Sequence, residues 1–160
     1  MADKTAKKPI LVPIDFSVAS EAALLKACDL ADCLNVPIVI LHVVHDPGEM
    51  PGYYSAMVKK KKFGRMQDAA QVMLDEFVHA FRKRHSGKKV LKKAERMLVI
   101  GLPATRILQV ADKTNATMVV MGSKGETGLK LLMLGSVAER VVQICPVPVL
   151  VVKAKPHDEK

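Results

Sequence analysis

Five short runs of apolar residues divide the chain, and four segments with helical spacing lie between them. The runs are rich in Ile, Val and Leu, which is typical of strands that are buried on both faces. The five expected strands cover Ile10–Ile14, Ile38–Val44, Arg96–Ile100, Met118–Met121 and Leu150–Val152. This alternation predicts an α/β fold, a three-layer α/β/α sandwich in which right-handed helical crossovers join parallel strands.

Local signals place the first two helices. Ser17 is a good N-cap for a helix over Val18–Leu34, and Pro37 limits how far this helix extends. A second helix is expected from about Gly64 to His85. Apolar residues at a spacing of three or four predict its inward face, which consists of Met66, Ala70, Met73, Phe77 and Phe81.

The rest of the chain adds two helices and one long connection. Pro103 suits the first turn of one helix, and the other is expected over Ser136–Ile144. The prolines and glycines of His45–Lys62 predict an irregular connection. A length of 160 residues and the lack of an internal repeat indicate one domain over residues 1–160, with a core over about 10–153 and polar tails at 1–9 and 154–160.

The net charge of +9 comes from one stretch. Residues 58–93 contain 12 Lys/Arg and 3 Asp/Glu, whereas the charges of the remaining residues cancel. Such a stretch can attract polyanions, although a solvated face beside a loop is the favoured interpretation. Nucleic acid is not the expected partner, because Phe63 is the one aromatic residue near the lysines and no recognition motif is present.

The apolar runs are far shorter than the roughly 18 residues of a membrane span, so we expect no membrane insertion. No secretory signal is visible, which favours a cytoplasmic location. The three cysteines, Cys28, Cys33 and Cys145, include no CxxC pair, which argues against a disulfide framework or a structural zinc site. His42 and His45 face opposite sides of a strand, so a shared metal ion is not expected.

A glycine-bearing segment follows the fourth expected strand. Gly122 ends that strand, Gly125 comes three residues later, and Gly135 and Ser136 open a helix. Glycines let backbone N–H groups approach a ligand, and a helix N-terminus favours negative charge. Lys124 adds a full positive charge. The segment therefore predicts an anion site, although each glycine could instead serve a tight turn or close packing. It is neither a Walker P-loop nor a GxGxxG fingerprint.

The spacing of Gly122, Gly125, Gly135 and Ser136 resembles the nucleotide signature of the universal stress protein family. Four further segments also resemble that family: Val12–Ser17, Leu41–Val43, Gly101–Pro103 and Pro148–Val152. The resemblance covers about Ile10–Lys153 and implies a Rossmann-like sheet in the order 3-2-1-4-5, as in adenine nucleotide alpha hydrolase-like folds. In that order strands 1 and 4 are neighbours at the topological switch point, where ligands settle beyond the strand ends.

The resemblance also implies the site residues, because ATP-binding members hold adenine near the first two strands and phosphates on the glycine segment. By motif position, the adenosine part would lie against Pro13, Asp15 and Val43. The path of the ribose and phosphates would be lined by Met121, Gly122, Ser123, Lys124 and Gly125, and closed by Gly135, Ser136 and Val137. Mg²⁺ or Mn²⁺ would be held through the phosphates. A capping role for Asp15 and simple core packing of Val43 and Met121 remain open alternatives.

We therefore expect an ATP-binding regulatory or stress-response module with an unidentified protein partner. One alternative is a slow ATPase, although Ser123, Glu126 and Thr127 include no dedicated base. The other is a module that binds a partner through basic residues 58–93. The resemblance further implies a homodimer built by antiparallel pairing of the fifth strands, with Pro148 marking the start of the ladder or facing away from it.

Overall fold

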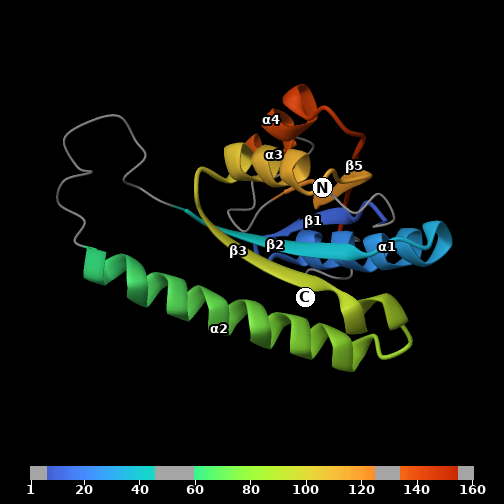
Figure 1. Ribbon diagram of the computed structural model, residues 1–160, viewed down its shortest axis with the longest axis horizontal. Helices are drawn as coiled ribbons and strands as arrows, with labels where there is room; N and C mark the ends of the chain where they lie inside the picture. Colours follow the sequence, from blue (N-terminus) through green and yellow to red (C-terminus); the bar gives the residue numbers. More distant parts are fainter. Residues whose placement is uncertain (1–6, 46–59, 125–133, 155–160) are drawn as a thin grey trace.

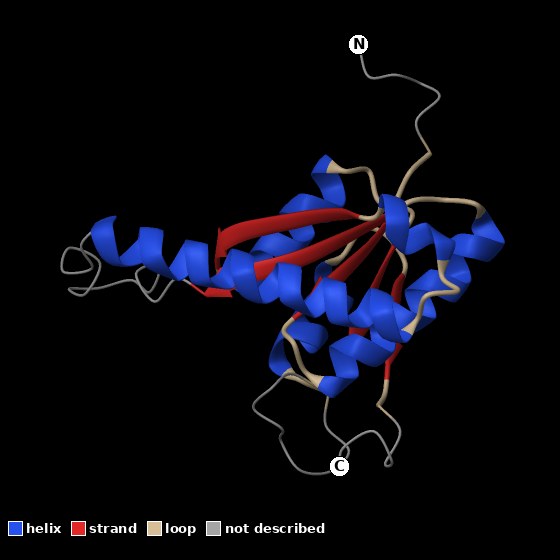
Figure 2. Cartoon of the chain, turned by 90° about the horizontal axis from the view of Figure 1, so that it is seen from below, coloured by secondary structure: helices blue, strands red, loops and turns tan. Residues whose placement is uncertain are grey.

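The computed structural model describes residues 7–45, 60–124 and 134–154, and side chains in all of these except 60–63. The described residues form a five-stranded parallel sheet in the order β3-β2-β1-β4-β5 (Figures 1 and 2). The strands are β1 (Ile10–Ile14), β2 (Ile38–His45), β3 (Glu95–Gly101), β4 (Met118–Gly122) and β5 (Val149–Val152). The predicted architecture and strand order are confirmed.

β1 lies at the centre of the sheet, and all five of its residues are buried. It pairs with β2 from Ile10 opposite Ile38 to Ile14 opposite His42. On its other side it pairs with β4, with Ile10 opposite Met118. A strand with neighbours on both edges and helices on both faces has no solvent contact, which explains its unbroken apolar sequence.

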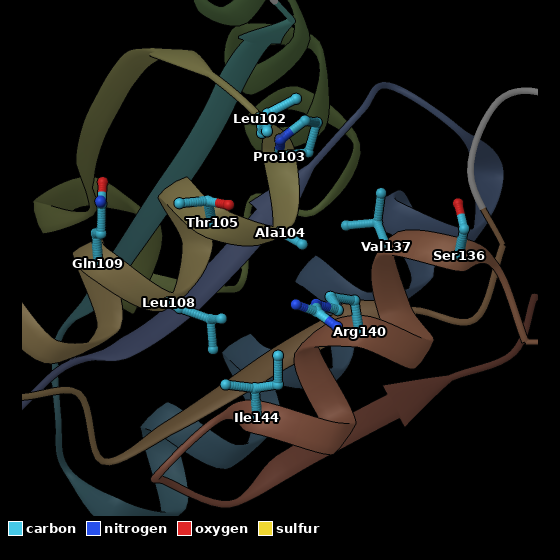
Figure 3. A pocket seen from close by; sticks show the side chains of 10 residues that line it. All are labelled: Leu102, Pro103, Ala104, Thr105, Leu108, Gln109, Ser136, Val137, Arg140 and Ile144. Carbon is cyan, nitrogen blue, oxygen red and sulfur yellow. The ribbon is translucent and has the colours of Figure 1, made fainter. Parts of the chain in front are cut away.

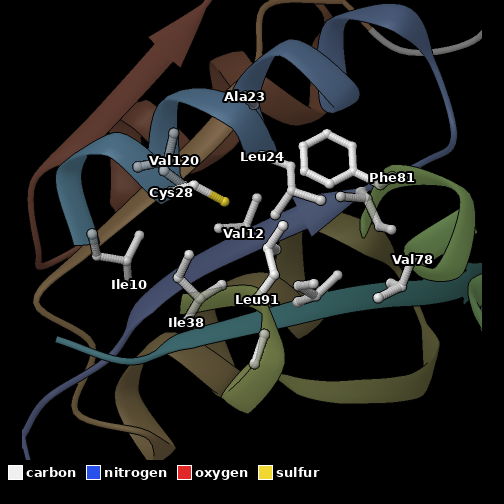
Figure 4. Packing of buried hydrophobic residues seen from close by; sticks show 14 of the residues in the cluster. Ile10, Val12, Ala23, Leu24, Cys28, Ile38, Val78, Phe81, Leu91 and Val120 are labelled. Carbon is white, nitrogen blue, oxygen red and sulfur yellow. The ribbon is translucent and has the colours of Figure 1, made fainter. Parts of the chain in front are cut away.

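One face of the sheet is covered by α1 (Val18–Leu34), α2 (Lys60–Arg84) and the short 3-10 helix η2 (Lys89–Lys93). Figure 4 shows Leu24 and Cys28 of α1 packed with Val12 of β1 and Phe81 of α2. Cys28 is fully buried, and burial raises the pKa of its thiol to about 12. The thiol is therefore a neutral packing group at physiological pH.

The other face is covered by α3 (Pro103–Lys113) and α4 (Ser136–Ile144), as Figure 1 shows. Ile107 of α3 and Val141 of α4 pack there against Leu11 of β1 and Val119 of β4. Leu11 and Val12 thus belong to different cores, as the alternation of side chains along a strand requires. The sheet separates two aliphatic cores, which together form the single domain.

The predicted inward face of α2 was partly wrong. The helix begins at Lys60 rather than near Gly64, and its buried residues are Ala70, Leu74, Val78 and Phe81. Met66 and Met73 are instead 37% and 51% exposed. α2 carries two apolar stripes that both step by three or four, and contact with the sheet selects the one that contains Leu74.

Ion pairs connect α1 to the end of α2 and to the residues just after α2, on the same face of the sheet. The Glu21 carboxylate of α1 lies 2.7 Å from the Arg84 guanidinium of α2, and the Asp29 carboxylate of α1 binds the ammonium of Lys88. These contacts use part of the positive charge of residues 58–93, while lysines 83, 89, 92 and 93 remain exposed. No helix within the described part of the chain is long and apolar enough to cross a membrane.

Candidate functional site

The carboxyl ends of the five strands lie at one edge of the sheet, because all the strands run in the same direction. Asp15 follows β1 and Gly122 ends the neighbouring strand β4, so residues more than a hundred positions apart meet at this edge. Val43 and Met121 pack into the core beneath α3 and α4. Pro13 belongs to the same face, since it lies two residues after Leu11 of that core.

Asp15 takes part in the turn that leads into α1. Its Oδ1 atom accepts hydrogen bonds from the Ser17 N–H at 3.1 Å and from the Ser17 hydroxyl at 2.5 Å. The Ser17 oxygen in turn accepts the Ser20 N–H at 3.1 Å, as the predicted N-cap should. Ser17 rather than Asp15 is therefore the N-cap of α1, and Asp15 supports that cap from outside the helix. A role of Asp15 toward a ligand remains a prediction.

Phe16 has a left-handed backbone with φ of 66°, which is uncommon for a bulky residue. Its ring packs against two rings of the α1 and α2 face, His42 at 4.4 Å and Phe77 at 5.6 Å between centroids. His42 also places its Nδ1 atom 2.9 Å from the carbonyl oxygen of Ile14. These contacts hold the turn after β1 in one conformation, which fixes where the Asp15 carboxylate lies.

Gly122 is where β4 meets the first turn of α1. A Cβ atom at this position would lie 2.8 Å from the carbonyl carbon of Ala19 and 3.0 Å from the backbone nitrogen of Ser20. Real Cβ atoms do not approach other heavy atoms so closely. Gly122 therefore has a packing role that is independent of any ligand, which is the alternative considered for each glycine of this segment.

The two ends of the glycine-bearing segment are joined by the backbone of Ser123. Its N–H donates to Val152 of β5 at 2.8 Å, and its carbonyl oxygen accepts the N–H of Gly135, also at 2.8 Å. Ser123 is buried, being 7% exposed. The hydrogen bond to Gly135 places the start of α4 directly beside the end of β4. This contact connects residues twelve positions apart, so sequence spacing alone did not indicate it.

The N-terminus of α4 has no side-chain cap. Gly135 occupies the N-cap position in an extended conformation, and no side chain there accepts a hydrogen bond from the helix. Ser136 is exposed, and Val137 packs at the edge of the core. The first N–H groups of a helix need partners from outside it, so this end is suited to an anion. Lys124 lies next to the joined ends of the segment.

Several sequence-predicted residues fall outside the described part of the chain. Gly125 of the proposed phosphate path is one of them, as are Glu126 and Thr127 of the ATPase alternative. Among the described residues no three or more His, Cys, Asp or Glu side chains are grouped as metal ligands would be. The described candidate residues supply backbone groups, hydroxyls, the Asp15 carboxylate and the Lys124 ammonium.

Sequence reasoning missed a hollow of about 580 Å³ between α3 and α4 (Figure 3). Its lining includes Ser136 and Val137 of the candidate site and extends along α4 to Arg140. Ser136 and Arg140 are four residues apart, a spacing that places them on the same side of a helix. The spacing of Ser136 and Arg140 could have indicated a shared side of α4. The sequence did not show that α3 would lie opposite that side.

The family assignment follows from comparison with known proteins. The sequence profile of the universal stress protein family matches residues 7–153, nearly the whole chain. The chain belongs to this family. The match confirms the family that the glycine spacing suggested.

Individual members of the universal stress protein family match over similar lengths. Universal stress protein MJ0577 of Methanocaldococcus jannaschii is 32% identical over 158 residues, with 92% of this chain and 96% of the relative covered. The solved structure of MJ0577 superposes with a TM-score of 0.67 at 27% identity, covering 94% of this chain and 99% of that one. A Mycolicibacterium smegmatis member is 34% identical over 150 residues; the match covers 94% of this chain but 47% of that relative, so the chain spans about half of its length.

One solved universal stress protein contains a nucleotide. The protein from Archaeoglobus fulgidus, in complex with dAMP, superposes with a TM-score of 0.61 at 26% identity. The superposition covers 91% of this chain and 97% of that protein. The same fold in the same family thus has a member that binds an adenine nucleotide.

Proposed function

We propose that this universal stress protein binds an adenine nucleotide, with ATP as the expected ligand, and acts as a nucleotide-dependent regulatory module. The dAMP complex of the Archaeoglobus fulgidus relative supports the ligand class. The position of Gly122, Gly135 and Ser136 at one edge of the sheet supports the location. Ligands of open α/β sheets bind beyond the strand ends at the switch point, which here lies between β1 and β4.

The observation that carries this proposal is the hydrogen bond from Gly135 to Ser123, which sets the uncapped end of α4 beside β4. Negatively charged phosphates would satisfy the free N–H groups of that end and would interact favourably with its partial positive charge. The Ser136 hydroxyl and the Lys124 ammonium would add donors from either side. Mg²⁺ or Mn²⁺ would reach the site with the phosphates, which supply the oxygen ligands that such ions prefer.

The adenosine part would lie toward the neighbouring strand ends. Val43 is half-buried on the α3 and α4 face of the sheet, and the buried residues Pro13 and Met121 lie on the same face. Asp15 offers a carboxylate at the end of β1, where part of it already serves the turn into α1. An apolar surface with a few fixed polar groups is the usual composition of a small-molecule site. Gly125 is included in the proposed nucleotide site on the basis of the sequence alone, because it lies outside the described residues.

Isothermal titration of protein freed of bound nucleotide tests the proposal. ATP should bind to the wild type. Gly135→Val should weaken ATP binding about tenfold or more, because the larger side chain keeps the backbone N–H groups from the phosphates. Losing one hydrogen bond to a charged group costs roughly 1.5–3 kcal/mol. Gly87→Val is the matched control, since Gly87 has open space around its Cβ position. Flat heats up to millimolar ATP with the wild type, or equal weakening in the control, would overturn the proposal.

We further propose a homodimer formed through β5. β5 is an edge strand, and exposed apolar residues gather near it: Val142 at 46%, Ile144 at 47% and Leu150 at 38%. An unprotected edge favours pairing with a second strand. Pro148, which has no N–H to donate, directly precedes the strand. Sedimentation at micromolar concentration should report a dimer, and Leu150→Lys should shift it toward monomer; a wild-type monomer would contradict the proposal.

A cytoplasmic location and a protein partner complete the proposal. All three cysteines are free thiols in the structure, as is usual in a reducing compartment. The exposed lysines of residues 58–93 favour a partner with an acidic surface. Such binding should weaken as salt is added, because exposed charges are screened within about 10 Å at 0.1 M ionic strength.

A further inference from the structure

The hollow between α3 and α4 has the dimensions and lining of a second small-molecule site. Its volume of about 580 Å³ falls within the roughly 300–1,000 Å³ of ligand pockets. Most of its lining is apolar: Leu102, Pro103, Ala104 and Leu108 from α3 and its N-cap, and Val137 and Ile144 from α4. Leu102 and Ile144 are 37% and 47% exposed, so apolar surface is open to water here.

One charged side chain lines this largely apolar hollow. Arg140 is the only ionisable side chain among the described residues that line the hollow. Figure 3 shows its side chain extending into the space between the two helices, near Ala104. No hydrogen bond or ion pair of Arg140 is present within the described part of the chain, in contrast to Arg84 and Arg96, which pair with Glu21 and Asp75.

We propose that this hollow binds a small amphipathic anion, a carboxylate carried on an apolar body. Arg140 is exposed, and its guanidinium would hold the carboxylate in a bidentate pair at the solvent side of the hollow. The apolar body would cover the side chains of Leu108 and Ile144. The polar Thr105 and Gln109 lie along the α3 side of the same hollow, where they leave room for a hydrated rim. The hollow shares Ser136 and Val137 with the proposed nucleotide site, but this proposal rests on Arg140 and on the residues of α3 and goes beyond nucleotide binding.

The direct test is a titration of the whole, nucleotide-free chain with decanoate, below the concentration at which decanoate forms micelles, followed by amide correlation spectra. Saturable shifts are expected for α3 and α4, and not for α1. Acetate, which has the head group without the apolar body, should produce no saturable shifts at the same concentrations. Arg140→Gln should weaken decanoate binding about threefold to fivefold, because the exposed guanidinium is the only charged group among the described residues that line the hollow. Arg140→Lys keeps the charge but cannot form the bidentate pair, so its affinity should lie between those of the wild type and Arg140→Gln.

Two further variants keep the test independent of folding. Lys113→Gln removes an exposed charge of α3 that does not line the hollow, so it should bind decanoate as the wild type does. Ala104→Leu keeps every charge but fills the space beside Arg140, so it should weaken decanoate and leave the spectrum dispersed. The proposal is overturned if Arg140→Gln binds as tightly as Lys113→Gln, if acetate saturates the same shifts, or if the shifts fall on β5 and depend on protein concentration.

Discussion

The N-termini of α1 and α4 face the same edge of the sheet but are built differently. At α1 the chain satisfies its own helix: Ser17 caps the Ser20 N–H, and Asp15 accepts two hydrogen bonds from Ser17. At α4 the cap position is held by Gly135, which has no side chain to offer. The first helix end is satisfied by its own chain, whereas the second has no side-chain cap among the described residues and is the end that we propose binds phosphate.

The difference continues along the two helices. α1 is tied to α2 and to the residue before η2 by the ion pairs Glu21–Arg84 and Asp29–Lys88. α4 makes no ion pair within the described residues, and it exposes Val142 and Ile144 instead. The α1 side thus carries ion pairs between its elements, whereas the α4 side is where we propose surfaces for a nucleotide, a second copy of the chain and a small anion.

The largest effect is expected where α1 contacts β4. Gly122→Ala would place a Cβ atom 2.8 Å from the Ala19 carbonyl carbon, so the first turn of α1 must move. Overpacking of this kind typically costs about 1–3 kcal/mol. Urea denaturation should show this loss without any ligand. Gly87→Ala is the matched control, since no heavy atom lies within 4 Å of its Cβ position, and it should change stability by less than about 0.5 kcal/mol. Equal midpoints for the two variants would show that the contact at Ala19 is unimportant.

An intermediate effect should separate the two caps. Ser17→Ala removes the hydroxyl that caps α1, which should lower the free energy of unfolding by about 1 kcal/mol. Ser136→Ala removes a hydroxyl that caps nothing in the structure, so its cost should be below about 0.5 kcal/mol. ATP affinity should instead fall in Ser136→Ala. Denaturation and titration of both variants check this, and a loss of stability in Ser136→Ala as large as in Ser17→Ala would remove the distinction between the helices.

The smallest effect concerns the ion pair of α1 with Lys88. The hydrogen bond from Lys88 lowers the pKa of Asp29, and the same bond raises the pKa of Lys88. Asp29 therefore contributes stability that is lost as pH falls through its lowered pKa, and Lys88 contributes stability that is lost as pH rises through its raised pKa. Lys88→Met should be slightly less stable than the wild type between about pH 4 and pH 10, with the difference vanishing beyond both limits.

Lys92→Met is the matched control for that measurement. Lys92 is exposed in the same η2 region and makes no ion pair among the described residues. Its stability difference from the wild type should therefore not depend on pH over the same range. A parallel pH dependence in both variants would point to net charge rather than to the pair with Asp29.

Elements with strong local signals were predictable from the sequence. β1 and α1 have the predicted bounds, because Ser17 caps the helix and Asn35, with φ of 53°, ends it. The inward face of α2 was predicted only in part, since two apolar stripes have the same period and only packing against the sheet distinguishes them. The 3-10 helix η2 was not predicted, because a five-residue, lysine-rich stretch has no periodic signal.

The candidate site shows the same division. The glycine positions and the strand order came from the sequence, partly through the family resemblance. The hydrogen bond between Ser123 and Gly135 and the contact of Gly122 with Ala19 did not, because both depend on how separate elements approach each other. Arg140 was missed for that reason too: its hollow exists only because α3 lies opposite α4.

The central position of β1 has a consequence for synthesis. Ile10 pairs with Met118, so one edge of the first strand has no partner until β4 has left the ribosome. Until then an aliphatic strand end with unpaired backbone groups is open to other nascent chains. Pairing over so long a sequence separation is also slow. We therefore expect truncated chains that stop before β4 to aggregate or to be held by chaperones, and the five-stranded sheet to form only after β4 and β5 have been synthesised.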